Sequence, residues 1–198
     1  MHVCYSGCMI ISVVNSKGGV GKTTTCMYLA AAAAKQNPDS RVAVLDCDPQ
    51  RSATDWWKFA GSVGDAPAFS VVADAGEAAD VDFLFIDTAP GNGAGIGAAV
   101  DAADLVIIPT EAEPMSMLRA RKTFDAVGGK GWLLLTKARR RTRLWVDTIA
   151  AVKESGARCF STSISDSVRY KGFAASPDDL GEYTDLWLEI MKISERED

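Results

Sequence analysis

Nine residues near the N-terminus have the composition and spacing of a loop that binds phosphate. Residues 16–24 read SKGGVGKTT, between a β-branched run and an Ala-rich segment. Three glycines in this stretch let successive backbone N–H groups turn toward one anion, because no Cβ intrudes. A helix that starts after the loop would add the positive end of its dipole. The residues expected to hold nucleotide phosphates are Gly18, Gly19, Val20, Gly21, Lys22, Thr23 and Thr24.

Lys22 and Thr23 add two further kinds of chemistry to this loop. The Lys22 ammonium supplies a point charge for the β- and γ-phosphates. The Thr23 hydroxyl is placed to ligate Mg²⁺. The pattern therefore predicts a Mg²⁺–nucleotide site in which Lys22 also serves catalysis.

Carboxylates follow two later apolar runs. Asp46 and Asp48 stand in the stretch LDCDPQ, and Asp87 follows a Phe-Leu-Phe-Ile run. On an extended segment, side chains at i and i+2 point the same way, so Asp46 and Asp48 can both face one cation. A strand that delivers a carboxylate to the edge of a sheet is typical of a Mg²⁺ site, which predicts that Asp87 holds the metal through water.

The elements that must position these residues alternate along the chain. Short apolar runs, typical of strands buried on both faces, occur at residues 9–14, 41–45, 83–86, 105–108 and 132–135. Segments long enough for helices lie at residues 24–36, 52–60, 95–103, 115–127 and 143–155. This alternation predicts an α/β fold, a doubly wound and mainly parallel sheet with helices on both faces. Ligands bind such sheets beyond the carboxyl ends of the strands, where the glycine- and aspartate-bearing segments gather.

Length and composition fit one globular domain. The 198 residues are 47% hydrophobic and 24% charged, near the averages for such domains. We expect a single domain over residues 9–198, and an N-terminal extension over residues 1–8 that adds nothing to the fold and can be disordered. No apolar run reaches the roughly 18 residues needed to span a bilayer. Five scattered cysteines favour a reduced, cytoplasmic setting.

Charge is distributed unevenly. The net charge of −5 argues against a wholly basic nucleic-acid binder, yet residues 117–175 hold 13 Lys or Arg against 4 Asp or Glu. Residues 137–143, KARRRTR, follow a predicted strand, and such a run could grip DNA without sequence preference. The alternative is a solvated loop, or one that contacts nucleotide or a protein partner. Arg158 could extend the patch, and the main candidate DNA contacts are Arg139, Arg140, Arg141, Arg143, Arg169 and Lys171.

One departure from the general phosphate-loop pattern is informative. The pattern G-x-x-x-x-G-K-[ST] requires glycine at position 16, but Ser16 stands there and Lys17 follows. The loop resembles the deviant Walker A motif, K-G-G-x-G-K-[TS], of the ParA/MinD superfamily of P-loop ATPases. DCDPQ resembles that family's D-x-D-P-Q segment, and DTAPG, with Ala89 in place of proline, resembles its D-T-P-P-G segment. The resemblance covers residues 9–193 and is greatest to short ParA-type partition ATPases that lack an N-terminal helix-turn-helix.

The resemblance implies roles for individual residues. Lys17 is expected to reach across a nucleotide-sandwich dimer and to stabilise charge on the partner subunit's phosphates in catalysis. Asp48 is expected to orient or activate the attacking water. Asp46 is expected to lie near the water shell of the metal, and the expected metal site then comprises Thr23, Asp46 and Asp87.

The nucleotide base is expected among the loops after the later strands. By the same resemblance, the candidates to bind it are residues 109–114 and the pair Thr136 and Lys137. No N-K-x-D guanine motif occurs in the expected place, which favours ATP over GTP.

The function that the resemblance implies is a slow ATPase that converts ATP to ADP and phosphate. Such a protein would use ATP and Mg²⁺, form a homodimer on ATP binding and bind DNA without sequence specificity. A ParB-like centromere-binding or adaptor protein would stimulate hydrolysis, and the cycle would position plasmid or chromosome cargo. The expected location is the cytoplasm, on the nucleoid in the ATP-bound form, without stable membrane association.

Three alternatives belong to other classes. A MinD-like positioning ATPase would place a C-terminal amphipathic helix on a membrane, but residues 185–193 lead into an acidic end, which favours core packing. A redox protein resembling the nitrogenase iron protein needs cluster-binding cysteines, and none occurs between Cys47 and Cys159. A nucleotide-sensing scaffold that does not hydrolyse ATP stays open, because a sequence gives no rate.

Overall fold

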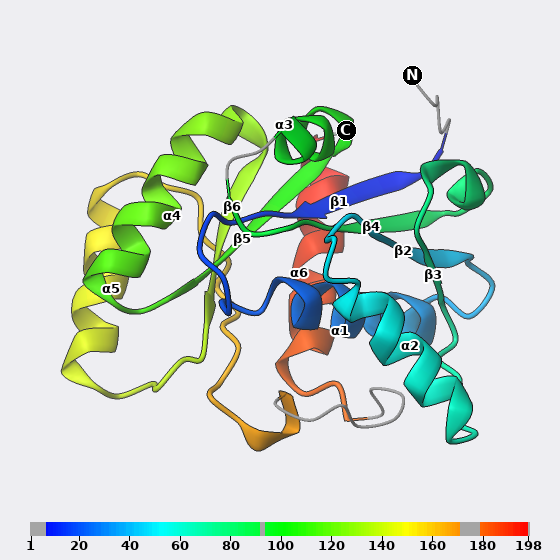
Figure 1. Ribbon diagram of the computed structural model, residues 1–198. Helices are drawn as coiled ribbons and strands as arrows, with labels where there is room; N and C mark the ends of the chain where they lie inside the picture. The colour runs from blue at the N-terminus through cyan, green and yellow to red at the C-terminus, as the bar shows by residue number, and fades with distance from the viewer. Residues whose placement is uncertain (1–6, 92–93, 171–178, 198) are drawn as a thin grey trace.

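Six parallel strands form the sheet at the centre of the molecule (Figure 1). The computed structural model describes residues 7–91, 94–170 and 179–197. The strands are β1 (Met9–Val13), β2 (Val42–Asp46), β3 (Ser70–Val72), β4 (Phe83–Asp87), β5 (Leu105–Glu111) and β6 (Gly131–Thr136). Their order across the sheet is β3-β2-β4-β1-β5-β6. The chain therefore builds one half of the sheet, returns to the centre and builds the other.

Helices join the strands and cover both faces of the sheet. The α-helices are α1 (Lys22–Gln36), α2 (Ser52–Ser62), α3 (Ala94–Ala102), α4 (Pro114–Val127), α5 (Arg143–Glu154) and α6 (Glu182–Glu197). Short 3₁₀ turns are η1 (Ala75–Ala78), η2 (Gly128–Lys130) and η3 (Val168–Tyr170). Helices α1, α2 and α6 contribute to one apolar cluster, and α3, α4 and α5 to the other.

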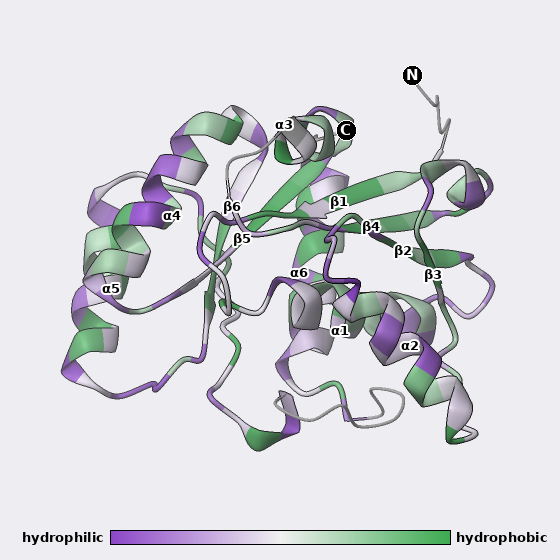
Figure 2. Ribbon diagram, viewed as in Figure 1, coloured by the Kyte–Doolittle hydropathy of each residue, from purple (hydrophilic) through white to green (hydrophobic). Residues whose placement is uncertain are grey.

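Alternation along each strand assigns its side chains to these two clusters. In β1, Ile11 packs with the α1 side and Ile10 with the α3 side, as the two-residue period of a strand requires. In β4, Phe85 packs on the α1 side and Leu84 on the α3 side. Because both faces are buried, the central strands are hydrophobic along their length (Figure 2).

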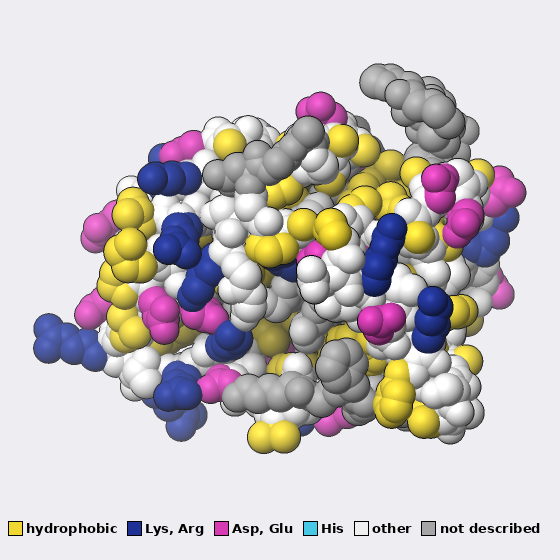
Figure 3. All heavy atoms as spheres, in the orientation of Figure 1, with side chains coloured by type: hydrophobic (Ala, Val, Ile, Leu, Met, Phe, Trp, Pro, Cys, Tyr) yellow, Lys and Arg dark blue, Asp and Glu magenta, His cyan; other side chains and the backbone are white. Residues whose placement is uncertain are grey.

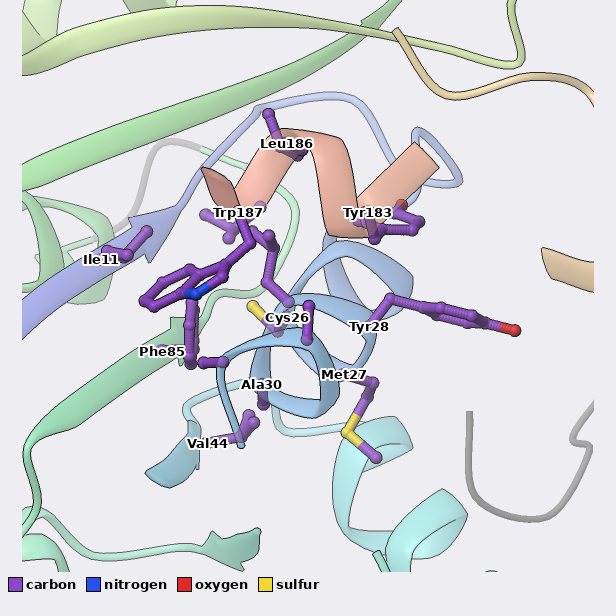
Figure 4. Close-up of a cluster of buried hydrophobic side chains, with 14 of the residues drawn as sticks. Ile11, Cys26, Met27, Tyr28, Ala30, Val44, Phe85, Tyr183, Leu186 and Trp187 are labelled. Atoms are coloured by element: carbon purple, nitrogen blue, oxygen red, sulfur yellow. The ribbon is translucent and has the colours of Figure 1, made fainter. Parts of the chain in front are cut away.

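The C-terminal helix α6 belongs to the core (Figure 4). The ring of Trp187 meets that of Phe83 edge-on, with centroids 4.9 Å apart, and Tyr183 stacks on Tyr28 of α1 at 5.1 Å. Such aromatic pairs add about 0.5–1.5 kcal/mol each beyond their burial. The apolar face of this helix is therefore used inside the subunit.

The fold class expected from the sequence is confirmed, with differences in detail. Strand β5 continues to Glu111, three residues beyond the expected run at 105–108. Strand β3 was not expected, because three residues at a sheet edge give too short an apolar run to be distinguished. Helix α1 begins two residues earlier than expected, directly after Gly21. Residues 1–6 of the expected N-terminal extension lie outside the described part of the chain.

Candidate nucleotide site

Three segments that carry candidate residues leave the sheet side by side, because β2, β4 and β1 are neighbours. In the strand register, Asp87 of β4 lies opposite Asp46 of β2 and also opposite Val13 of β1, which leads into the phosphate loop. A pocket of about 360 Å³ opens at this edge. It is lined by residues of the phosphate loop and of three later segments, namely Gly18, Gly19, Gly21, Lys22, Thr23, Thr24, Asp48, Ser52, Trp56, Pro90 and Tyr170.

The phosphate loop has a backbone that glycine adopts readily and other residues do not. Gly19 and Gly21 have φ of 73° and 93°, in the left-handed region. Asn15 fixes the entry to the loop: its side-chain nitrogen donates to the Pro109 carbonyl at 2.7 Å, and its side-chain oxygen accepts from the Lys17 N–H at 3.0 Å. Because α1 starts directly after Gly21, the first N–H groups of the helix are available to an anion in the pocket.

Lys22 places a nearly buried charge beneath this loop. Its side chain is 7% exposed, and Nζ donates to the backbone oxygen of Lys17 at 3.4 Å. Burial lowers the pKa of the ammonium, and the carboxylates of Asp87 and Asp48 oppose that effect. A phosphate in the pocket would supply the counter-charge that a buried ammonium requires.

Asp87 lies in the environment expected of a metal ligand. The residue is fully buried, and neither carboxylate oxygen has a hydrogen-bond partner among the described residues. Burial raises the pKa of Asp87 to about 7 against the opposing effect of the neighbouring Thr23 side chain, and nearby Asp46 adds to the rise. Oxygen ligands of this kind suit Mg²⁺, and Thr23, whose side chain acts on Asp87, lines the pocket. The residues present therefore fit a magnesium ion held by Asp87 and Thr23.

Both carboxylate oxygens of Asp46 accept hydrogen bonds from within the chain. Its Oδ2 accepts from the Thr54 N–H at 2.9 Å and from the Thr54 hydroxyl at 2.7 Å, while Oδ1 accepts from the Asp48 N–H at 3.2 Å. These bonds tie the end of β2 to the first turn of α2. A role for Asp46 at the metal stays a prediction.

Asp48 is presented to the pocket by a tight turn. Its Oδ1 accepts from the Gln50 N–H at 2.9 Å, and the side chain lines the pocket with Lys22 and Thr23. The predicted role in orienting water is compatible with this position and stays a prediction.

Lys17 contacts side chains of its own subunit. Its Nζ donates to Oε2 of Glu111 at 2.7 Å and to Oγ of Ser116 at 2.9 Å. Its predicted reach to the phosphates of a second subunit stays a prediction. No sequence motif pointed to Glu111, because its partner Lys17 is 94 residues away in the chain.

A model of the CobQ/CobB/MinD/ParA nucleotide-binding domain matches residues 11–176. This chain belongs to that family. The resemblance to the ParA/MinD superfamily is thereby confirmed.

Individual members of the CobQ/CobB/MinD/ParA family agree with this assignment. Maintenance of carboxysome distribution protein A of Gloeobacter kilaueensis is 36% identical over 117 residues, which cover 54% of this chain and 51% of that protein. The chain thus matches about half the length of this relative. A plasmid partition protein of Borrelia burgdorferi bound to AMPPNP superposes with a TM-score of 0.73 at 19% identity, covering 96% and 100% of the two chains. The pNOB8 ParA bound to nonspecific DNA superposes with a TM-score of 0.71 at 16% identity, covering 96% of this chain and 100% of that one. At these identities the two structures share the fold.

The loops predicted to hold the base lie beside the phosphate loop of this MinD/ParA-family chain. Thr136 and Lys137 line a second, smaller pocket with Val20, Thr24 and Tyr170. The Thr136 hydroxyl already donates to the Val20 carbonyl at 3.0 Å, which ties β6 to the phosphate loop. Base contacts by Thr136 and Lys137 stay predictions.

Aromatic residues that no motif singled out flank the two pockets. Trp56 lines the larger pocket and Tyr183 the smaller one, and Tyr170 lines both. Tyr28 packs against Tyr170 with ring centroids 5.1 Å apart. Isolated aromatic residues give no local signal of a site, because their spacing in the sequence follows no pattern.

The basic run after β6 forms a loop in which some cations bond to neighbouring residues of the same chain. Arg139 donates to Asp166 at 2.9 Å, and Arg140 donates to the backbone oxygen of Ser163 at 2.7 Å. Arg141 is exposed, and the side chain of Arg143 is 95% exposed, with its Nε 3.7 Å from Oδ2 of Asp147 one turn further along α5. Lys and Arg side chains are visible in this part of the surface (Figure 3).

Three further residues, Arg158, Arg169 and Lys171, were predicted to extend the basic patch. Arg169 pairs with Asp179 at 2.9 Å. Arg158 packs over Trp132, at the start of β6, so it does not extend the loop that follows the end of this strand. Lys171 falls outside the described residues.

The tail helix does not offer the surface that a MinD-like membrane anchor needs. Tyr183, Leu186, Trp187 and Ile190 of α6 are buried. Within the part of the chain that the structure describes, no helix combines the length and apolar character required to cross a bilayer.

Proposed function

We propose that this protein is a ParA-type ATPase that binds ATP with Mg²⁺, dimerises in that state and hydrolyses ATP slowly. The observation that carries the proposal is the buried, unpartnered carboxylate of Asp87 beside Lys22 and the glycine loop. A buried carboxylate without a hydrogen-bond partner is costly unless a cation completes it. Because the Asp87 carboxylate lies next to the phosphate loop, Mg²⁺–ATP is the ligand that would supply a cation to the carboxylate and phosphates to Lys22 and the loop.

Each residue of the site has a step to perform in the proposed reaction. Lys22 and the loop N–H groups bind the β- and γ-phosphates and offset the charge that develops on the leaving oxygen. Asp48 accepts a hydrogen bond from a water molecule and directs its oxygen at the γ-phosphorus. A bound Mg²⁺, held by Asp87 and Thr23, would neutralise charge on the phosphate oxygens. The water oxygen bonds to the γ-phosphorus as the bond from that phosphorus to the bridging oxygen breaks, and the proton that the water loses passes by way of Asp48 to the products, ADP and phosphate.

Dimerisation would complete the site. Lys17 precedes the glycine loop, and its ammonium could offset charge on the phosphates of a second subunit. The chain is similar to a carboxysome distribution protein and to plasmid partition proteins, which supports cargo positioning as the purpose of the cycle. A ParB-like or adaptor partner that stimulates hydrolysis belongs to the same proposal, as do a cytoplasmic location and association with the nucleoid.

Mass in solution with and without nucleotide tests the proposal. We expect the 21.1 kDa chain to be monomeric alone and to double in mass with AMPPNP and Mg²⁺, as measured by light scattering after gel filtration. Phosphate release from ATP should be slow and should stop when EDTA removes the metal. A single-subunit mass at saturating AMPPNP would contradict ATP-driven dimerisation, and Mg²⁺-independent phosphate release would contradict the metal site.

Non-specific DNA is the proposed second ligand, and Arg141 and Arg143 are the cations best placed to bind it. Unlike Arg139 and Arg140, they do not tie the loop to Asp166 or Ser163. Replacing both with glutamate is expected to weaken binding of the AMPPNP-bound protein to a mixed-sequence duplex by about 10- to 100-fold, and to reduce the slope of log affinity against log salt by about 2. Fluorescence anisotropy over a salt series measures both.

The matched control is Lys35→Glu with Lys192→Glu. These two exposed lysines lie away from the loop, near the end of α1 and near the end of α6. This control should bind DNA nearly as the unmodified protein does. If Arg141→Glu with Arg143→Glu lowers ATP affinity as much as DNA affinity, the loop serves the nucleotide site instead.

A further inference from the structure

The Lys17 ammonium group is held by three side chains at or just after the end of β5. Glu111 Oε2 lies 2.7 Å from Nζ, Ser116 Oγ lies at 2.9 Å and Glu113 Oε2 at 3.8 Å. An ammonium has three N–H donors, and this set of oxygens surrounds it. Ser116 is buried and the Glu111 side chain is only 14% exposed, so the contact differs from a solvated surface pair.

Glu111 is itself fixed from a second direction. Its Oε1 accepts from Lys137 at 2.6 Å, so each carboxylate oxygen has its own lysine. As the last residue of β5, Glu111 also lies in register with Thr136 of β6, directly before Lys137. Burial opposes ionisation, but the hydrogen bonds from Lys137 and Lys17 outweigh it and lower the pKa of Glu111 below its usual range. The carboxylate is therefore charged at neutral pH and positioned before any partner arrives.

We propose that Glu111 competes, within each subunit, with the phosphate of a second subunit for the ammonium group of Lys17. The inference rests on the ATP-driven dimer proposed above. The N–H donors of Lys17 that contact Glu111 and Ser116 are the ones that a phosphate in a facing subunit would require. A contact made only in the isolated subunit stabilises that state by its own free energy. Glu111 thus helps to set the protein and nucleotide concentrations at which two subunits pair.

The symmetry of a dimer doubles the effect in free energy. Each subunit would have to release its own Lys17, so two Glu111 contacts are lost for every dimer formed. If one contact favours the isolated subunit about 5-fold, at the low end of typical coupling between sites, the dimer dissociation constant rises about 25-fold. Removing the contact should lower that constant by the same factor.

Glu111→Gln in the full chain tests this competition. At saturating AMPPNP and Mg²⁺, sedimentation velocity over a protein dilution series gives the dimer dissociation constant, which should be about 25-fold lower than in the unmodified protein. The affinity of the monomer for fluorescent ADP is measured alongside, because Glu111 also holds Lys137, a predicted base contact; a gain in ADP affinity as large as the gain in dimerisation would overturn the competition. Asp125→Asn is the matched control, since it removes the same charge from an exposed pair with Arg121 on α4, and its dissociation constant should not change.

A second measurement examines the contact without nucleotide. A double-mutant cycle measures it by urea unfolding of four proteins: the unmodified protein, Lys17→Met, Glu111→Gln and the double variant. The pair should be coupled by about 5-fold in the unfolding equilibrium constant, and the absence of coupling would overturn the proposal.

The two measurements separate this inference from the proposed function. If the unmodified protein dimerises with AMPPNP but Glu111→Gln does so no more tightly, only the competition is refuted. If the unmodified protein stays monomeric with AMPPNP, the proposed dimer is refuted, and the competition falls with it even where the double-mutant cycle shows coupling.

Discussion

Replacement of Lys22 with alanine is expected to weaken ATP binding at least about 100-fold, or about 2.7 kcal/mol. The side chain is 7% exposed and lies in the pocket beneath the glycine loop. A charge-assisted hydrogen bond contributes about 1.5–3 kcal/mol, and the attraction between an ammonium and a triphosphate is stronger away from bulk water. Titration of a fluorescent ATP analogue measures the loss.

The control for this prediction is Lys35→Ala, which removes an exposed lysine from the last turn of the same helix. It should bind ATP as the unmodified protein does. Lys22→Ala should also stay folded in urea titrations, because burial lowers the pKa of this ammonium and therefore disfavours its charged form in the empty site. An ATP affinity within 3-fold of the unmodified value would remove Lys22 from the phosphate site.

Replacement of Asp48 with alanine is expected to slow ATP hydrolysis by about 100- to 10,000-fold while ATP binding is retained, the range for loss of a group that assists proton transfer. Asp48 lines the pocket, but Lys22 and the glycine loop supply the contacts that hold the phosphates. Because hydrolysis ends the dimeric state in the proposed cycle, the dimer should persist with ATP, as is expected of the unmodified protein with AMPPNP. Single-turnover phosphate release and light scattering measure the two effects.

Asp48→Asn separates chemistry from structure in this experiment. An asparagine oxygen can still accept the Gln50 N–H that Asp48 accepts at 2.9 Å, so the turn should be kept, but the amide is a poor proton acceptor. Asp55→Asn, on the exposed side of α2, is the control of equal charge change. Hydrolysis at the unmodified rate in Asp48→Asn would exclude Asp48 as the residue that orients water.

Local signals in the sequence were sufficient to predict the centre of the site. A phosphate loop is one continuous segment whose glycines, Lys22 and Thr23 must stand at fixed spacing, so its chemistry can be recognised without knowledge of the fold. The carboxylate of Asp87 was predicted in the same way, from an apolar strand that ends in an acid. The fold class followed from the alternation of apolar strands and helices, and the structure confirms it.

Other features depended on residues that are distant in the sequence. The amphipathic pattern of the tail indicated core packing, but only the structure shows Trp187 against Phe83 and Tyr183 against Tyr28. The basic run predicted one patch, yet Arg139 is paired with Asp166 and Arg158 packs on Trp132. A charged residue in a sequence carries no sign of whether the folded chain neutralises it.

By itself, then, the sequence determined that this protein has a phosphate loop, nearby acidic residues and a parallel α/β fold, because each of these depends on the spacing of neighbouring residues. Only the tertiary structure decided that Asp87 is buried without a hydrogen-bond partner and that Lys17 is held by Glu111. Those properties arise from strand order, which brings β4 beside β1 on one side and β5 beside it on the other. Strand order is fixed by the packing of the whole sheet and its helices, and no short segment encodes it.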